Sequence, residues 1–232
     1  MRPEDNTGAA PLHWLSNNAA RARYGRCMAA DRPEFVSRGF VGRPHGAGAD
    51  LLPPGQYLER GFPVLTAGPT PRLEPAEWSF RIDGLVDDEL EWSWDEFAKL
   101  PFEDVPCDIH CVTKWSKLGT SFRGVSVDLL LEAARPQAAL SMAHSFGGYT
   151  TNLPLEELTG GRAWVVTEHE GAPLPREHGG PVRLLVPHLY FWKSAKWVRG
   201  LTLTVEDEPG FWEAAGYNNY GDPWREQRYW GD

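Results

Sequence analysis

The chain has 232 residues, enough for one domain or one and a half, and a formal net charge of −9 at neutral pH. Its 20 Pro and 24 Gly interrupt helices, so the composition argues against a helical bundle and favours short strands, turns and structured loops. Three Cys exclude a disulfide scaffold, and the odd number leaves at least one thiol unpaired. The negative charge disfavours a nucleic-acid or anionic-membrane binder, and no apolar stretch is long enough to span a bilayer.

The N-terminal region differs in composition from the rest of the chain. Residues 1–50 are rich in Ala, Arg, Gly and Asn and show no sustained hydrophobic period, so an extension with one short helix and a partly disordered arm both fit. The first residues have neither the apolar core of a signal peptide nor a twin-Arg pair, so we expect a cytoplasmic protein with reduced thiols. We predict a partly irregular extension over 1–50 and one domain with a C-terminal tail over 51–232.

The first regular structure is expected after an irregular segment. Residues 52–75 carry many Pro and Gly between apolar anchors, so we expect them to form an ordered irregular segment that lies on the core. Trp78, Phe80 and Ile82 then alternate with polar residues, which is typical of a half-buried strand. Residues 83–89 favour a turn after that strand.

Two short helices are predicted next. Ser93 and Glu96 have the spacing of a capping box, which predicts a helix of about two turns over 94–100. Residues 105–112 favour a strand. Residues 127–134 favour a short amphipathic helix, which the proline that follows would stop.

The second half of the chain favours strands. Four apolar runs predict strands, at 140–146, 163–168, 182–186 and 197–205. Residues 152–157 resemble a capped helical turn with Pro near its start. Strands with short helices between them, and no regular β-α-β rhythm, indicate an α+β fold that is rich in β structure.

Cys107, His110 and Cys111 form one compact group of reactive side chains. A zinc site would need a fourth ligand, for which Cys27 is the remaining thiol, and no second Cys/His pair has finger-like spacing. A redox disulfide between Cys107 and Cys111 requires a helical segment, because four residues of strand span about 13 Å and a disulfide needs Cα atoms within about 7 Å. A single functional thiolate at a strand end and a buried inert cysteine are the other interpretations.

A basic segment lies further along this acidic chain. Residues 176–199 hold one acid, Glu177, and five basic residues: Arg176, Arg183, Lys193, Lys196 and Arg199. His178, His188 and the Gly179-Gly180 pair add donors and a tight turn. The segment predicts an anion pocket, in which each charge-assisted hydrogen bond to a phosphate would contribute about 1.5–3 kcal/mol. A solvated basic face is the alternative, and neither a P-loop nor a G-x-G-x-x-G fingerprint is present.

Three motifs together resemble a known family. They are HCVTKWS from His110, GYTTNLPLEEL from Gly148 and PLPREHGGPVRLLVPHLYFWKSAKWV from Pro173. In combination they are similar to the molybdopterin-binding domain of the sulfite oxidase superfamily, over about residues 55–205. The catalytic subunit of a bacterial methionine sulfoxide reductase and small sulfite oxidase-like oxidoreductases belong to that superfamily, and residues 210–232 resemble the tail of the latter. The resemblance implies a sulfite-oxidase-type fold, mixed and β-rich with short helices.

The resemblance also implies a molybdenum–molybdopterin cofactor. In that family one Cys thiolate binds molybdenum beside the two dithiolene sulfurs, and Cys111 matches its position. A thiolate is a soft ligand that suits such a metal. By the same resemblance, Thr113 and Lys114 are candidates to face the substrate. Residues at positions that match pterin contacts are Phe62, Pro63, Gly147, His178, Arg183, Lys193, Ser194, Ala195 and Lys196.

The expected activity is oxygen-atom transfer on a small substrate such as a sulfite-like species, a sulfoxide or an N-oxide, with electrons exchanged with a separate partner. Sulfite oxidase proper has arginines shortly after its Cys, where this chain has Ser116 and Lys117. The acidic tail over 205–232 is a candidate to dock the partner or to cover the site. The alternatives are a non-catalytic binding module of the same fold and a thiol redox protein that uses Cys107 and Cys111.

Overall fold

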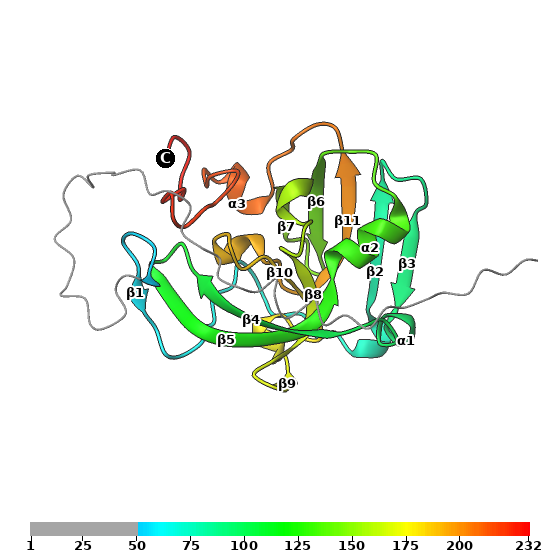
Figure 1. Cartoon of the computed structure of the whole chain (residues 1–232), viewed down its shortest axis with the longest axis horizontal. Coiled ribbons are helices and arrows are strands. Elements are labelled where there is room, and N and C mark those ends of the chain that lie inside the picture. Colours follow the sequence, from blue (N-terminus) through cyan, green and yellow to red (C-terminus); the bar gives the residue numbers. More distant parts are fainter. Residues whose placement is uncertain (1–50) are drawn as a thin grey trace, which may run out of the picture. The chain divides into compact units, whose positions relative to one another are not determined.

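A computed structural model describes residues 51–232, and the extension predicted over 1–50 lies outside them. Short elements dominate this part of the chain (Figure 1). The strands are β1 (Tyr57–Leu58), β2 (Ser79–Gly84), β3 (Leu90–Ser93), β4 (Glu103–His110), β5 (Trp115–Ser126), β6 (Leu140–Ser145), β7 (Thr150–Pro154), β8 (Trp164–His169), β9 (Ala172–Pro173), β10 (Arg183–Leu185) and β11 (Val198–Thr204). The α-helices are α1 (Trp94–Phe97), α2 (Val127–Ala134) and α3 (Phe211–Ala214). The 3-10 turns are Pro75–Glu77, Leu155–Glu157, Arg176–His178 and Phe191–Lys193.

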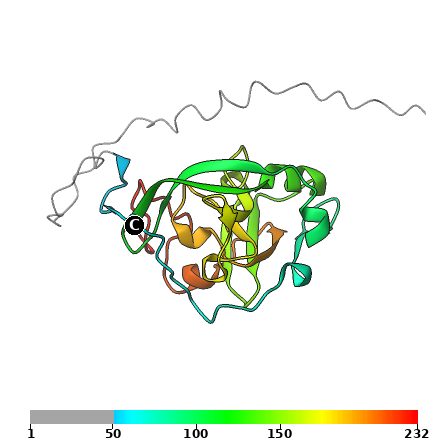
Figure 2. The ribbon, with the colours of Figure 1, turned by 90° about the horizontal axis from the view of Figure 1, so that it is seen from below.

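The strands form two mixed sheets. The first runs β1-β5-β8-β10, with β4 also paired to β5 and β9 to β8, and β1 is its parallel member. The second runs β3-β2-β11-β6-β7, and β2 and β11 pair in parallel. Figure 2 shows the β4–β5 hairpin as a long ribbon along one side of the other elements. Mixed sheets with a few short helices confirm the predicted α+β, β-rich fold.

Two apolar clusters fill the interior. The larger one joins the second sheet to α1 and α2, and Phe80 and Ile82 of β2 have no exposed surface. Burying a side chain of this size contributes about 1.5–3 kcal/mol. The smaller cluster covers the first sheet and contains Ile109, Trp115 and Cys111. The thiol of interest therefore lies at the edge of a packed core.

Several sequence predictions are confirmed. The alternation from Trp78 to Ile82 corresponds to β2 and the residue before it. The predicted helix over 127–134 is α2, whose Ser126 side chain accepts a hydrogen bond from the backbone N of Asp128. The helix ends where Arg135 adopts a left-handed conformation. The strands predicted around 105–112, 140–146, 163–168, 182–186 and 197–205 are β4, β6, β8, β10 and β11.

Other predictions are wrong in their bounds. The capping box of Ser93 and Glu96 forms, but α1 ends at Phe97 instead of residue 100. Asn152 and the two residues after it belong to β7, and the predicted helical turn is only Leu155–Glu157. The sequence pattern missed β3, β7 and the twelve-residue β5. Two glycines in β5 obscure its alternation, and Gly124 is needed because a Cβ there would lie 2.3 Å from the Val165 carbonyl oxygen.

Candidate functional site

Cys111 lies directly after β4, at the start of the tight loop that leads into β5. Its backbone N donates to the Trp115 carbonyl at 2.8 Å, and its carbonyl accepts from the Lys114 N at 3.0 Å. Lys114 has a φ of 78°, a left-handed conformation that is uncommon for a residue other than Gly. The hairpin geometry thus places the thiol at a fixed point where the two strands meet.

The Cys111 sulfur is 3.1 Å from the Thr113 hydroxyl, with either atom as the donor, and Cys111 is only 7% exposed. Burial raises the pKa of this thiol, while the Thr113 hydrogen bond and the positive charge of Arg228 oppose that rise. Cys107 lies within β4, where burial raises its pKa to about 12. Both thiols are unpaired.

Two side chains from distant segments hold the loop that carries Cys111. Gln56 donates from Nε2 to the Cys111 carbonyl at 3.1 Å. Arg228 donates from Nη1 to the Val112 carbonyl at 2.8 Å. Sequence reasoning missed both residues, because neither stands in a motif and each is more than fifty positions from Cys111. In Figure 1 the C-terminal tail, drawn in red, lies near β1 and the end of the β4–β5 hairpin.

His178 and Phe62, both predicted as pterin contacts, stack on each other. Their ring centroids are 3.9 Å apart and their planes differ by 14°. Burial, followed by the charges of Arg183 and Lys196, lowers the pKa of His178 to about 4, so the ring is neutral at neutral pH. Phe62 also meets the Trp115 ring edge-on at 6.5 Å. Phe62 therefore connects the Cys111 hairpin to His178, and Pro63 follows it, half-buried.

Arg183 is 1% exposed and organises the backbone around His178. It donates to the carbonyls of His178 and Ser194, each at 2.8 Å. Its guanidinium carbon lies 4.0 Å from the centre of the Phe191 ring. Burial lowers its pKa to about 9, so it still carries its charge at neutral pH. The structure thus brings three predicted contacts, His178, Arg183 and Ser194, into one cluster.

Lys196 belongs to the same cluster, since its backbone pairs with that of Arg183. Its Nζ donates to the Leu65 and Glu177 carbonyls at 2.6 and 2.5 Å. Burial lowers the pKa of Lys196 to about 8. Ala195 lies between Ser194 and Lys196, is 1% exposed and accepts a hydrogen bond from the Leu184 N. The Ser194–Lys196 stretch is therefore an ordered backbone segment with one ammonium at its edge.

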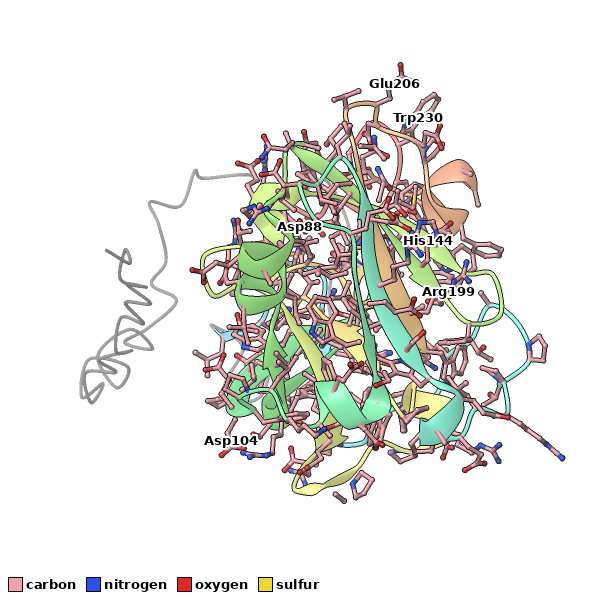
Figure 3. The ribbon with its side chains drawn as sticks, turned by 90° about the vertical axis from the view of Figure 1, so that its right-hand side faces the viewer. Asp88, Asp104, His144, Arg199, Glu206 and Trp230 are labelled. Carbon is pink, nitrogen blue, oxygen red and sulfur yellow. The ribbon has the colours of Figure 1, made fainter. Side chains whose placement is uncertain are left out.

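The predicted basic segment does not converge on a single pocket. Lys193 forms an ion pair with Glu213 at 2.6 Å, and neither side chain has exposed surface. Its ammonium also donates to the Asn152 carbonyl at 2.7 Å. The charge of Lys193 is thus used inside the protein, which argues against its predicted pterin contact. Arg199 is exposed on the second sheet beside His144 (Figure 3).

Gly147 lies in the turn between β6 and β7, exposed and with a φ of 92°. Its neighbour Phe146 donates from its backbone N to the Trp197 carbonyl at 2.8 Å. The turn is therefore tied to the residue that follows Lys196. Within residues 51–232, no backbone hydrogen bond joins Gly147 to Cys111 or His178.

The chemistry of the site fits a metal that arrives with an organic cofactor. Within the described part of the chain no group of three His, Cys, Asp or Glu side chains could hold a metal ion, so Cys111 would supply a single soft ligand. The ring nitrogens Trp115 Nε1 and His178 Nδ1 are buried without a hydrogen-bond partner. Both rings contact Phe62, and polar groups of a bound cofactor are candidates to satisfy the two nitrogens.

A buried thiol, two ring nitrogens without hydrogen-bond partners and a group of cations near His178 are the features of this mixed β-rich fold that a bound cofactor could use. Residues 67–212 match the family model described as the oxidoreductase molybdopterin binding domain. The chain belongs to this family, and the resemblance seen in its motifs is confirmed.

Similar proteins agree with this family. The chain is 42% identical over 181 residues to the uncharacterized oxidoreductase YuiH of Bacillus subtilis, covering 77% of this chain and 91% of that protein. It is 28% identical over 64% of its length to the putative protein-methionine-sulfoxide reductase subunit YedZ1 of Azospira oryzae. It is 27% identical over 70% of its length to the protein-methionine-sulfoxide reductase catalytic subunit MsrP of Pseudomonas syringae. The chain spans 57% and 53% of the latter two proteins, about half of each.

A solved structure supports the fold. The sulfane dehydrogenase SoxCD of Paracoccus pantotrophus superposes with a TM-score of 0.54 at 20% identity, over 59% of this chain and 40% of that chain. This similarity supports a common fold and carries no information on the substrate. Among the described residues, none of the helices has the length and apolar character needed to cross a membrane.

Proposed function

We propose that this chain is a molybdenum-cofactor-dependent oxidoreductase that moves an oxygen atom to or from a small substrate, with residues 51–232 as its single cofactor-binding domain. The observation that carries the proposal is the Cys111 thiol, fixed at a hairpin end in a chain of the molybdopterin-binding family. When bound, the cofactor would supply two-electron redox chemistry at molybdenum. The protein would supply one ligand, the orientation of the pterin and the local charge.

Cys111 is the proposed metal ligand. Its backbone bonds to Lys114 and Trp115 fix the direction of the side chain, and the Thr113 hydroxyl at 3.1 Å would donate to the thiolate once the proton is lost. Such a hydrogen bond to a ligating sulfur tunes the electron density that the metal receives. Thr113 and Lys114 are both exposed, so they are proposed to face the substrate.

The pterin side of the proposed site is built from Phe62, His178, Arg183 and Lys196. Lys196 carries a positive charge at an accessible edge, which suits the terminal phosphate of the cofactor. His178 is neutral and has a free ring nitrogen, which suits a hydrogen bond to an uncharged heterocycle. Arg183 is proposed to act indirectly, by holding the backbone of the residues around it, because its guanidinium already donates to the carbonyls of His178 and Ser194.

Sulfoxides and related oxygen donors are the proposed substrate class. The support is that two relatives are named as methionine-sulfoxide reductase subunits. Electrons would be exchanged with a separate protein; among the described residues no group of three His, Cys, Asp or Glu side chains could hold a metal ion as a further redox centre. The two unpaired thiols are in keeping with a reducing compartment such as the cytoplasm.

The geometry disfavours the thiol redox alternative. Cys107 and Cys111 are separated by the end of β4, an extended segment in which four residues span about 13 Å. Burial also raises the pKa of both thiols, which reduces the thiolate fraction that attacks a disulfide.

The test is elemental analysis of the full chain, produced in a host that makes the molybdenum cofactor. We expect stoichiometric molybdenum in the wild type, its loss in Cys111→Ser, and its retention in the matched control Cys107→Ser. The loaded protein should also reduce a sulfoxide when supplied with a chemically reduced viologen. A wild-type protein without molybdenum or pterin fluorescence would refute the proposal, as would full loading of the Cys111 variant.

A further inference from the structure

Two consecutive carbonyls of the Cys111 loop accept hydrogen bonds from side chains far away in the sequence. The Cys111 carbonyl accepts from Gln56 at 3.1 Å, and the Val112 carbonyl accepts from Arg228 at 2.8 Å. Gln56 is 4% exposed and Arg228 is 8% exposed, so both bonds are shielded from water. Both residues lie outside the span 67–212 that the family model matches.

Arg228 makes several contacts at once. Nη1 reaches Val112 O, Nη2 reaches Pro54 O at 3.3 Å, and the guanidinium carbon lies 4.9 Å from the centre of the Tyr190 ring. The side chain therefore links the Cys111 loop to the segment before β1 and to the core. A planar guanidinium can serve two carbonyls in fixed directions, which a lysine ammonium does less well.

The tail that delivers Arg228 is anchored to other segments at two places, and a third bond closes a turn within its end. At its start, Glu213 of α3 pairs with Lys193 and accepts a hydrogen bond from the Trp192 Nε1 at 2.9 Å. In its middle, the Gly221 carbonyl accepts from the Tyr190 N at 2.7 Å. At its end, an Asp232 carboxylate oxygen accepts from the backbone N of Arg228 at 3.0 Å. The guanidinium is thus held by a tail fixed along its length.

The loop itself needs external support. Lys114 occupies a left-handed conformation with φ 78°, which persists in a non-Gly residue only where the surroundings impose it. Within the loop, Cys111 bonds through its backbone to Lys114 and Trp115 and through its sulfur to the Thr113 hydroxyl. From outside the loop, the backbone N of Tyr57 donates to the Lys114 carbonyl at 2.8 Å, and Gln56 and Arg228 donate to two earlier carbonyls of the loop.

We propose that Arg228 is a positioning residue for the metal-ligating loop: it fixes the Val112 carbonyl and thereby the direction of the Cys111 thiol. The C-terminal tail then acts as a strap that supports the metal site from outside residues 67–212, the part of the chain that the family model matches. This inference rests on the proposed function, in which Cys111 is the molybdenum ligand, and it adds a residue that does not touch the metal.

The experiment compares the full chain with Arg228→Ala, Arg228→Lys and the control Arg225→Ala, which removes an exposed arginine from the same tail. Hydrogen exchange of the loop 111–114 is measured in cofactor-free protein, with β2 and β11 amides as the internal reference for folding. Molybdenum content and the Mo(V) electron paramagnetic resonance spectrum are measured in loaded protein.

We expect loop exchange to rise about tenfold or more in Arg228→Ala, because a hydrogen bond from a charged group is removed, while the reference strands stay protected. Molybdenum content should fall or the spectrum should shift in Arg228→Ala, with a smaller change in Arg228→Lys and none in Arg225→Ala. If Arg228→Ala does not fold, the proposal is tested on Arg228→Lys by the same three measurements: loop hydrogen exchange, molybdenum content and the Mo(V) spectrum.

Unchanged loop exchange together with an unchanged spectrum in a folded Arg228 variant would overturn the inference, as would equal effects of Arg225→Ala. The two proposals fail in different ways. Absence of molybdenum from the wild type refutes the proposed function, whereas the hydrogen-exchange comparison in cofactor-free protein tests the strap independently.

Discussion

The buried ion pair between Lys193 and Glu213 gives the sharpest quantitative prediction. The two charges are 2.6 Å apart and neither side chain is exposed, so Glu213→Gln leaves an ammonium in the interior without its counter-charge. Removing one partner of such a pair costs about 3–5 kcal/mol of unfolding free energy. For a chain of this length that loss lowers Tm by about 6–20 °C. The Gln side chain is nearly isosteric, so a packing defect contributes little.

Thermal and urea unfolding of the wild type, Glu213→Gln, Lys193→Met and the double variant measures this cost as a double-mutant cycle. The double variant should recover most of the loss, because replacing both charges removes the unpaired one. Arg81→Gln is the matched control, since the Arg81–Glu89 pair is exposed (48% and 56%) and should contribute about 0–1 kcal/mol. The reasoning is wrong if Glu213→Gln costs no more than this control, or if the single-variant losses simply add.

The same variants test the original prediction that Lys193 contacts the pterin. If the ammonium serves only its internal partners Glu213 and Asn152, the folded double variant should load molybdenum as the wild type does. If Lys193 contacts the cofactor, the double variant should fold normally and lose molybdenum. Stability and metal content therefore separate the two roles of one side chain.

Two further predictions follow from the geometry. Gly124→Ala places a Cβ 2.3 Å from the Val165 carbonyl oxygen and should cost about 1–3 kcal/mol in urea unfolding; full stability would contradict the close approach of β5 and β8. In cofactor-free protein, NMR titration should show His178 neutral down to about pH 4, and Phe62→Ala should return its pKa toward 6.5. Because the unfolded chain binds more protons between those two pH values, His178 lowers stability as pH falls from 6.5 to about 4.

Local patterns predicted the elements whose residues carry their own signals. The helix over 127–134 was predictable because its amphipathic pattern and the proline that follows it are local signals. The alternation around Phe80 predicted β2, since one face of that strand is buried and the other is not. The twelve-residue β5 was not predicted from the sequence. Its residues pair at different points with β1, β4 and β8, so no single alternation of buried and exposed side chains runs through it.

The candidate site, like the fold, was only partly predictable from the sequence. Its motifs pointed to Cys111, His178, Arg183 and Lys196, and three of these form one cluster at His178. The sequence could not show that Lys193 is neutralised by Glu213, because charge counting treats every lysine as available. Burial and pairing depend on which segments meet in space.

By itself, the sequence determined the fold class and the family and singled out Cys111 as the proposed metal ligand, since these inferences depend on residue type and local spacing. Only the tertiary structure decided which basic residues gather near His178 and which are neutralised in internal ion pairs. It alone also brought Gln56 and Arg228 to the carbonyls of the Cys111 loop. Those contacts join segments more than fifty residues apart, and their geometry arises from the folded packing of the whole domain.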